Sequence, residues 1–426
     1  MLLTAHLTKK IAALIPKGKN FAIAFSGGGD STALVYALKD HPQASHAYIV
    51  DHKLRKDSGA EAVAAKQFAL VCGYDSKILT WEHSSPTSAL QEKARKARYA
   101  FIGHQCREDG INYVLTAHSE DDQAETLLMR YDRKTDWRGA AGIAEKTYGP
   151  VWPALAMVTL VRPLLDMTRQ ELRDYNRKHH LSWSEDPSNE NRDYARIRAR
   201  DYLKSRPRLR SHLLETARDM RSCLDDEKCF LRDEFARIGQ IDANGIITLS
   251  EVPLPEFMFH ALRCAGGQGG TVDRARIKDL LGQMRADNFK STTLGGALVV
   301  KHEGLFVICR DPVAVKGRQD SHHERRSIRS GLNFRLNNTP RIWDGRFSVT
   351  GPKRRSYMGS VHQNMELLLP EQVEILKRIP EVARLTLPVS KKENLVRILG
   401  HGDLGSRTVI SLVNMRLEAA LGGTLK

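Results

Sequence analysis

An α/β fold with a parallel, doubly wound sheet is predicted for the first part of the chain. Up to about residue 185, short apolar runs typical of strands alternate with longer stretches of helical periodicity. Two capping boxes, Ser58-x-x-Glu61 and Thr168-x-x-Glu171, predict where two of the intervening helices begin. The predicted strands are Phe21–Phe25, Ala47–Val50, Lys77–Trp81, Tyr113–Thr116 and Met157–Val161.

The chain has 426 residues, more than the roughly 100–200 of a typical domain, so several domains are expected. A polar, arginine-rich stretch from Asp186 to Arg210 predicts the end of the first domain. We predict an α/β domain over 1–210, a helical connector and middle domain over 211–312, and a small, basic α+β domain over 313–426. The cues are a long helix over Ser211–Gly239, a helix over Val272–Met284, a hairpin-like pair Thr292–Val300 and Gly304–Cys309, a basic linker Lys316–Arg329, and a helix near Thr408–Leu421.

Charge and composition narrow the function classes. The formal net charge of +16 suits a polyanionic partner such as nucleic acid, although a solvated basic surface would have the same composition. The six cysteines are scattered and include no Cys-x-x-Cys pair, which argues against a disulfide framework and a zinc ribbon. Because no signal-peptide core and no run of transmembrane length occurs, we expect a soluble, cytoplasmic protein that does not bind a membrane.

A glycine-rich loop, SGGGDS at Ser26–Ser31, joins the first predicted strand to a helix. Backbone N–H groups freed by glycines, together with a helix N-terminus, form an anion site, although an ordinary strand-to-helix turn can look similar. The loop lacks both Gly-Lys-Ser/Thr and Gly-x-Gly-x-x-Gly. It resembles the SGGxDS loop of the N-type ATP pyrophosphatases. That resemblance implies ATP and Mg²⁺ as cofactors, phosphate contacts from the loop, and an Asp30 that helps to hold the metal. The implied ATP-binding residues are Ser26, Gly27, Gly28, Gly29, Asp30 and Ser31.

A second cluster follows the fourth predicted strand. His118, Asp122 and Glu125 are spaced to share one face of a helix, at the sheet edge where open α/β folds bind ligands. An imidazole with several carboxylates can hold a cationic substrate or a metal; a solvated acidic face is the alternative. Arg95 and Arg98 lie one turn apart on the predicted helix Ala89–Glu108. Their guanidiniums could brace a triphosphate or RNA phosphates, or simply face solvent.

A third element is the acidic turn Asp186–Asn189, which leads into the clustered arginines of Tyr194–Arg200. Taken in order with Asp51–Arg55 and Arg162–Leu165, these motifs resemble those of the tRNA(Ile)-lysidine synthetases across roughly residues 20–200. The resemblance implies an adenine nucleotide alpha hydrolase-like fold and a two-step reaction. ATP adenylates the carbonyl oxygen at carbon-2 of the wobble cytidine of CAU-anticodon tRNA(Ile), and L-lysine then attacks carbon-2 and displaces AMP to form lysidine.

The same resemblance implies residue roles. Asp122 and Glu125 match an acidic lysine site, and the implied catalytic set is Asp30, Asp122, Glu125 and Arg196. The implied substrate- and RNA-binding residues are His118, Asp121, Arg95, Arg98 and Arg200. Three positions depart from the family pattern: Lys134-Thr135-Asp136 stands where Gly-Ser-Gly is usual, Lys53 replaces a glycine, and Ile197 replaces an asparagine. Further along, Thr293–Gly296 resembles the family's tRNA-binding extension, and Trp343–Phe347 and Leu399–Gly405 are compatible with a tRNA-binding tail.

Other functions within reach of these motifs are a tRNA thiolase, an amidotransferase-type synthetase and a non-catalytic tRNA-binding homologue. Thiolases of this kind commonly carry paired Cys-x-x-Cys groups, which this chain lacks. An amidotransferase would need a second catalytic domain with a nucleophilic cysteine, and none is evident. The intact loop and acidic pair argue against loss of activity. The sequence does not decide between a monomer and a homodimer.

Overall fold

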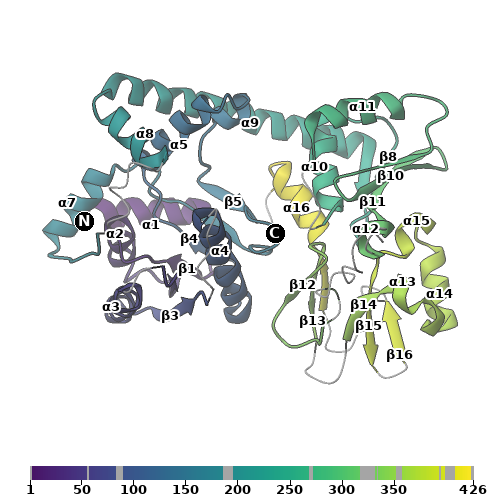
Figure 1. The fold of residues 1–426 in the computed structure, drawn as a ribbon, viewed down its shortest axis with the longest axis horizontal. Helices are drawn as coiled ribbons and strands as arrows, with labels where there is room; N and C mark the ends of the chain where they lie inside the picture. Colours follow the sequence, from purple (N-terminus) through teal and green to yellow (C-terminus); the bar gives the residue numbers. More distant parts are fainter. Residues whose placement is uncertain are drawn as a thin grey trace. The chain divides into compact units, whose positions relative to one another are not determined.

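The computed structural model describes residues 2–54, 57–82, 90–185, 195–267, 272–316, 332, 334–351, 357–392, 395–398 and 408–423. Arg55, the turn Asp186–Asn189, Tyr194, the linker beyond Lys316 and Leu399–Gly405 lie outside the described residues. The chain divides into two compact units, Met1–Asp226 and Glu227–Lys426, which we describe one at a time (Figure 1).

A six-stranded sheet forms the centre of the first unit. Its strand order is β3-β2-β1-β4-β6-β5, and every neighbouring pair is parallel except the one between β5 and β6. All five predicted strands are confirmed, with ends shifted by up to three residues, and the antiparallel edge strand β5 was not predicted. The strands are β1 (Phe21–Ala24), β2 (Ala44–Asp51), β3 (Asp75–Thr80), β4 (Tyr113–Leu115), β5 (Lys146–Tyr148) and β6 (Thr159–Val161).

Helices cover both faces of this sheet. Successive side chains of a strand point to opposite faces, so Phe21 and Ile23 of β1 pack in one apolar cluster and Ala22 packs in another. The first cluster includes residues of α1 (Leu2–Leu14), α2 (Gly29–Ala37) and α3 (Ser58–Val71), and the second includes residues of α4 (Leu90–Asp109). The predicted doubly wound, mainly parallel architecture is therefore confirmed (Figure 1).

One of the two predicted capping boxes is correct. Thr168 caps α7 (Arg169–Lys178), and the Glu171 carboxylate accepts the Thr168 backbone N–H at 2.7 Å. The box at Ser58 is wrong because Asp57 is the N-cap of α3, and the Ser58 hydroxyl instead donates to Asp51 at 2.8 Å. The remaining helices that begin in this unit are α5 (Glu120–Asp132), α6 (Trp137–Ala140), α8 (Ala195–Lys204) and α9 (Pro207–Ile238).

Helix α9 is continuous through the predicted boundary at 210 and 211, and the division of the chain into two units falls later on the same helix, after Asp226. Within the second unit, α10 (Pro255–Ala265) and α11 (Arg274–Met284) pack on a five-stranded antiparallel sheet. The predicted strand over Thr292–Val300 is split in two at Gly295 and Gly296, whose φ angles of +62° and +81° make the turn. The sheet order is β7 (Gly239–Ile241), β8 (Ile247–Leu249), β11 (Leu305–Arg310), β10 (Ala297–His302) and β9 (Ser291–Leu294).

The last part of the chain is a small α+β region, as predicted. The predicted helix over Thr408–Leu421 begins only at Leu412, because Thr408–Ser411 pairs with β13 as a strand. Two three-stranded sheets occur, β12 (Arg341–Trp343), β13 (Phe347–Thr350) and β17 (Thr408–Ser411), and β14 (Tyr357–Ser360), β15 (Pro388–Lys392) and β16 (Leu395–Ile398). The helices are α12 (Pro312–Lys316), α13 (Val361–Asn364), the 3₁₀ turn η2 (Met365–Leu367), α14 (Pro370–Lys377), α15 (Glu381–Arg384) and α16 (Leu412–Ala420).

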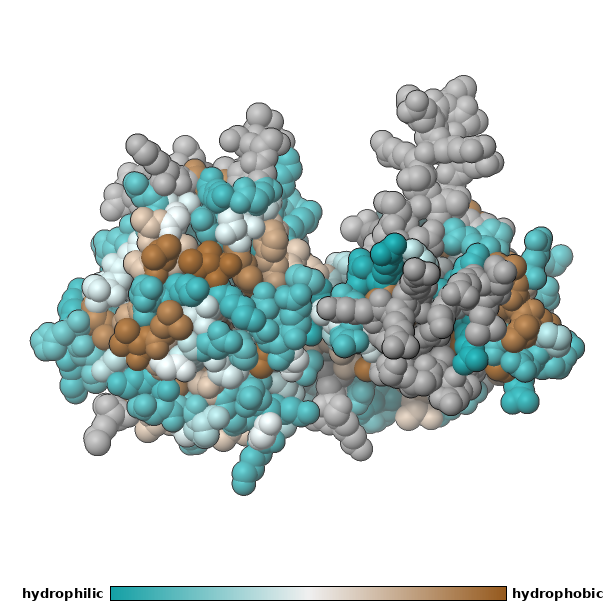
Figure 2. All heavy atoms as spheres, turned by 90° about the horizontal axis from the view of Figure 1, so that it is seen from below, coloured by the Kyte–Doolittle hydropathy of each residue, from teal (hydrophilic) through white to brown (hydrophobic). Residues whose placement is uncertain are grey.

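The face of the molecule drawn in Figure 2 is mainly hydrophilic, with some apolar patches. Figure 2 shows hydrophobic side chains lying among hydrophilic ones on the face seen from below. Helix α3 contributes exposed apolar side chains in Val63, Leu70 and Val71. Among the residues described, no helix is both long and apolar enough to cross a lipid bilayer.

Candidate active site

The predicted phosphate loop lies where β1 ends and α2 begins. Gly27 has a φ of +78°, which a side chain would disfavour, and Gly28 is the N-cap of α2. The Ser31 hydroxyl donates to the Gly28 carbonyl at 2.9 Å and lies 3.0 Å from the Ser26 hydroxyl. These bonds close the loop around the helix N-terminus, where backbone N–H groups favour an anion.

A segment from much later in the chain holds this loop in place. Asn176 of α7 is fully buried and donates to the Gly29 carbonyl at 2.8 Å, and the Ser184 N–H donates to the Gly27 carbonyl at 2.9 Å. The Trp183 ring lies so close to Gly29 that an added Cβ would stand 3.3 Å from it. Asn176, Trp183 and Ser184 were not predicted from the sequence, since no local pattern shows that α7 packs against α2.

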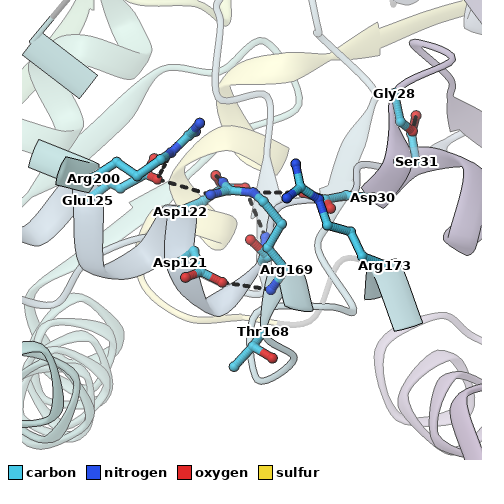
Figure 3. A network of polar contacts seen from close by, with 12 residues as sticks. Gly28, Asp30, Ser31, Asp121, Asp122, Glu125, Thr168, Arg169, Arg173 and Arg200 are labelled. Atoms are coloured by element: carbon cyan, nitrogen blue, oxygen red, sulfur yellow. Dashed lines mark hydrogen bonds and ion pairs between the residues drawn. The ribbon is translucent and has the colours of Figure 1, made fainter. Parts of the chain in front are cut away.

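The acidic pair Asp122 and Glu125 lies on α5 and is surrounded by arginines (Figure 3). Glu125 has a side chain only 2 % exposed, yet it bonds Arg196 and Arg200 at 2.8 Å each and Arg169 at 3.3 Å. Asp122 contacts Arg169 at 2.8 Å and Arg196 at 3.0 Å through one oxygen. Its other oxygen accepts the Ser119 backbone N–H at 2.9 Å. The structure thus brings together Asp122, Glu125, Arg196 and Arg200, four of the predicted site residues, although the pairing of these arginines with the acidic pair was not predicted.

Arg169 joins this pair to the phosphate loop and was missed in the sequence analysis. Its guanidinium reaches Asp122 and Glu125, and its Nε lies 3.5 Å from the Asp30 carboxylate (Figure 3). Its backbone N–H also donates to Asp121 at 2.7 Å. The capping box at Thr168 marks where α7 starts, but it does not show where the next side chain points.

Asp121 has a different set of partners from the acidic pair. Besides the Arg169 backbone, its carboxylate lies 3.6 Å from Arg210, which also pairs with Glu120 at 2.7 Å. These contacts tie the first turn of α5 to the starts of α7 and α9. In the structure Asp121 therefore positions helices around the site.

Burial sets the charge state of the site's titratable groups. Burial raises the pKa of Asp30 to about 6. The positive charges of Arg169 and Arg173 lower this pKa, and the negative charge of Asp122 raises it further. At Asp122 burial also opposes ionisation, but Arg196 and Arg169 outweigh it and hold the pKa of that carboxyl below its usual value. Burial lowers the pKa of His118 to about 4, so the imidazole is neutral at neutral pH.

His118 is not on the helix that carries the acidic pair. Ser119 is the N-cap of α5, so His118 belongs to the loop after β4, and its Nδ1 lies 2.9 Å from the Thr116 hydroxyl. The predicted helical spacing of His118, Asp122 and Glu125 is therefore wrong. His118 nevertheless lies near Asp122, whose negative charge acts on the imidazole and opposes the lowering of its pKa by burial.

Arg95 and Arg98 have partners of their own on α4. Arg98 donates to His52 at 3.3 Å, and Arg95 lies over the Tyr99 ring at 4.9 Å from its centroid. Among the contacts of the described residues, neither guanidinium pairs with the acidic pair. Their predicted phosphate or RNA contacts stay a prediction.

The structure shows how the chain accommodates the three departures from the family pattern. Lys53 and Lys134 stand where glycine is usual and adopt left-handed backbone conformations with φ of +48° and +50°. A non-glycine residue in that region costs about 1–2 kcal/mol, so the chain keeps the turn at some cost in stability. Ile197 is buried on α8 and packs in place of the usual asparagine.

The described residues could hold a divalent cation at this site only together with the phosphate oxygens of a bound nucleotide. Within the described part of the chain, no three His, Cys, Asp or Glu side chains form a metal-binding group. Mg²⁺ is usually held by one or two carboxylates, substrate phosphates and water, and Asp30 at the phosphate loop provides one such carboxylate. The donor chemistry is therefore suited to Mg²⁺ that arrives with phosphate oxygens.

An anion-binding loop and an arginine-linked acidic pair at the carboxyl edge of a parallel sheet define a nucleotide-dependent enzyme of the PP-loop class. The family model described as a PP-loop domain matches residues 3–206. The tRNA(Ile)-lysidine synthase of Ruegeria pomeroyi is 31 % identical over 364 residues, which cover 82 % of this chain and 80 % of that protein. The enzyme of the same name from Mesorhizobium japonicum is 32 % identical over 354 residues, which cover 77 % and 71 %. The chain belongs to the tRNA(Ile)-lysidine synthase family.

Among solved structures, a U34-tRNA thiolase from Methanococcus maripaludis matches with a TM-score of 0.43 and 16 % identity, covering 51 % of this chain and 78 % of that one. A TM-score this low supports no conclusion about the site.

Proposed function

We propose that this protein joins L-lysine to carbon-2 of the wobble cytidine of CAU-anticodon tRNA(Ile), using ATP and Mg²⁺ and releasing AMP and pyrophosphate. The observation that supports this best is the contact of Arg169 with Asp30 on one side and with Asp122 and Glu125 on the other. This contact supports the proposal because it links the predicted phosphate loop to two carboxylates, the groups that an ammonium group pairs with. The proposal assigns catalysis to a domain over 1–210 and tRNA binding to the regions over 211–312 and 313–426.

In the first step the cytidine O2 attacks the α-phosphorus of ATP, and pyrophosphate leaves. The loop N–H groups and the Ser26 and Ser31 hydroxyls would bind the phosphate oxygens. Asp30 would hold Mg²⁺, which when bound offsets phosphate charge. Adenylation turns the poor leaving oxygen at carbon-2 into a good one, because AMP departs as a stabilised phosphate.

In the second step the lysine ε-nitrogen attacks carbon-2, the bond from carbon-2 to the adenylate oxygen breaks, and AMP leaves. The ε-ammonium must lose a proton before its nitrogen can attack. Asp122 and Glu125 would hold the amino groups of lysine beside the adenylated base. His118, neutral at neutral pH, is able to accept a hydrogen bond there without adding positive charge.

The direct test incubates the protein with ATP, Mg²⁺, radiolabelled lysine and a CAU-anticodon tRNA(Ile) transcript. We expect label to enter the tRNA and one AMP to form for each lysine joined. A transcript with uridine at the wobble position is the control and should gain no label. Failure to label the cytidine transcript would rule out the proposed activity.

The tRNA phosphates would meet a basic surface on α8 and the start of α9. Exposed side chains there are Arg198, Lys204, Arg206 and Arg208. The Arg206 guanidinium stacks on the exposed Tyr202 ring at 3.8 Å from its centroid. The same α8 carries Arg196 and Arg200, which reach Glu125, so this surface adjoins the site.

We expect the double variant Arg206→Ala/Arg208→Ala to weaken tRNA binding and to flatten its salt dependence. Each lost phosphate contact should reduce the slope of log K against log [salt] by about 0.7–0.9. Filter binding over a range of salt concentrations measures it. Lys9→Ala/Lys17→Ala removes the same charge from exposed positions in the N-terminal part of the chain and is the matched control. Equal slopes for the two double variants would exclude this surface.

A further inference from the structure

Every carboxylate oxygen of the acidic pair already has a donor among the described residues. Three carboxylates, Asp30, Asp122 and Glu125, face three guanidiniums, Arg169, Arg196 and Arg200, at distances between 2.8 and 3.5 Å. The charges of this group balance. A lysine ammonium added to it would be a fourth cation among three carboxylates, and like charges this close repel strongly where solvent is scarce.

A cationic substrate therefore has to replace an arginine rather than join the group. Among the carboxylates described, Arg200 contacts Glu125 alone, so its departure would not open a position between the two carboxylates. Of the residues that the structure describes, only Arg169 and Arg196 bridge Asp122 and Glu125. The position that an ammonium would occupy is held by one of these two.

Arg169 is the more firmly held of the two. Its side chain is 18 % exposed, it also faces Asp30, and its backbone N–H is bonded to Asp121. The Arg196 side chain is 42 % exposed and contacts only the acidic pair among the carboxylates described. A long, partly exposed guanidinium can turn to a phosphate, for which its planar donors are well suited.

We propose that Arg196 is an exchangeable counter-ion: it occupies the lysine ammonium position in the free protein and leaves it when the α-phosphate of bound nucleotide attracts the guanidinium. This inference rests on the proposed function. Arg196 then stabilises the phosphate while the acidic pair becomes free for lysine. Lysine binding is thereby coupled to nucleotide binding, which keeps the amine out of the site until a nucleotide is bound.

The test measures lysine affinity of the full chain by calorimetry, with and without an ATP analogue that has a methylene between the α- and β-phosphates. For the wild type we expect the analogue to tighten lysine binding by about tenfold or more, the size of a typical coupling between two sites. Arg196→Ala should bind lysine without the analogue about as tightly as the wild type does with it, because the position is already open. The analogue should then change the lysine affinity of this variant by less than about twofold.

Arg200→Ala is the matched control, because it removes the same charge from Glu125 on the same helix but opens no position between the carboxylates. It should keep the full nucleotide dependence. Arg196→Gln, which retains side-chain length, repeats the test in case the alanine variant is poorly folded. If the Arg196 and Arg200 variants behave alike, the effect is one of net charge and the proposal is overturned. A wild type that binds lysine equally tightly with and without the analogue would also overturn it.

The lysine-transfer assay on the wild type separates this inference from the proposed function. If the wild type labels the cytidine transcript but the lysine affinities do not depend on nucleotide and on Arg196 as expected, the proposed exchange is wrong and the proposed activity is retained. If the wild type transfers no lysine, the activity is wrong, whatever the affinities.

Discussion

Replacing Asp30 by alanine should abolish AMP formation and leave tRNA binding nearly unchanged. Asp30 lies in the first turn of α2, at the phosphate loop, and is the carboxylate we assign to Mg²⁺. Removing a single group that stabilises charge in a transition state typically slows a reaction by about a hundred- to a thousandfold. The basic surface we assign to tRNA lies on α8 and α9, so affinity for tRNA should change by less than about twofold.

This substitution should not unfold the protein. Burial raises the pKa of Asp30 to about 6, which means that the ionised carboxylate is less stable in the folded chain than in the unfolded one. Above pH 6 its removal therefore relieves an unfavourable burial. AMP release and filter binding of tRNA are the two measurements, and Asp40→Ala, at an exposed position just after α2, is the control. A variant that still forms AMP at the wild-type rate, or that loses tRNA binding, would contradict the assigned division of roles.

Replacing Asp344 by asparagine should destabilise the second unit by about 3–5 kcal/mol, the usual cost of leaving a buried charge unpaired. Asp344 is fully buried and bonds Arg310 through both oxygens, at 2.8 and 3.0 Å, and Arg346 at 2.8 Å. Arg310 also donates to the carbonyls of Gly266 and Gly296. Without the aspartate charge, two guanidiniums would remain in the interior with no counter-ion in this cluster.

Asparagine is the informative substitution at this position. The backbone of Asp344 has a φ of +51°, a conformation that asparagine tolerates better than alanine, so the change isolates the charge from backbone strain. Scanning calorimetry of the full chain should show a lower melting temperature for the second unit. Asp279→Asn, at an exposed position on α11, should stay within about 0.5 kcal/mol of the wild type. Equal melting temperatures for the two variants would show that the buried cluster contributes little.

Features formed by contiguous residues could be predicted from the sequence, whereas features that depend on other parts of the chain could not. The strands around β1 and the loop at Ser26–Ser31 were predictable because each is a short contiguous pattern: the strands are apolar runs, and the loop is a motif of six consecutive residues. The edge strand β5 was missed because three residues without apolar alternation show no such pattern. His118 was placed on a helix because its spacing to Asp122 fits one, but Ser119 is the N-cap, with an extended backbone and its N–H bonded to Asp122, so the helix starts after it.

In the second unit, too, two elements were predicted incorrectly from the sequence. Thr292–Val300 looked like one strand, and the turn at Gly295 and Gly296 divides it in two. Thr408–Ser411 looked helical together with the residues after it, yet it pairs with β13. In the first place the two glycines form a turn within the segment, so its two halves pair with each other. In the second, a strand from elsewhere in the chain decided the local structure, since backbone hydrogen bonds to that strand outweigh a weak helical preference.

By itself the sequence determined the doubly wound arrangement, the phosphate loop and the presence of acidic and basic residues at the edge of the sheet. Only the tertiary structure decided how those charges pair. Arg169, Arg196 and Arg200 reach Glu125 from positions 44, 71 and 75 residues away along the chain. Arginine side chains are long and can point in many directions, so which carboxylate each one meets depends on how α5, α7 and α8 pack. The neutral, fully paired acidic site, and the exchange that we infer from it, follow from that packing.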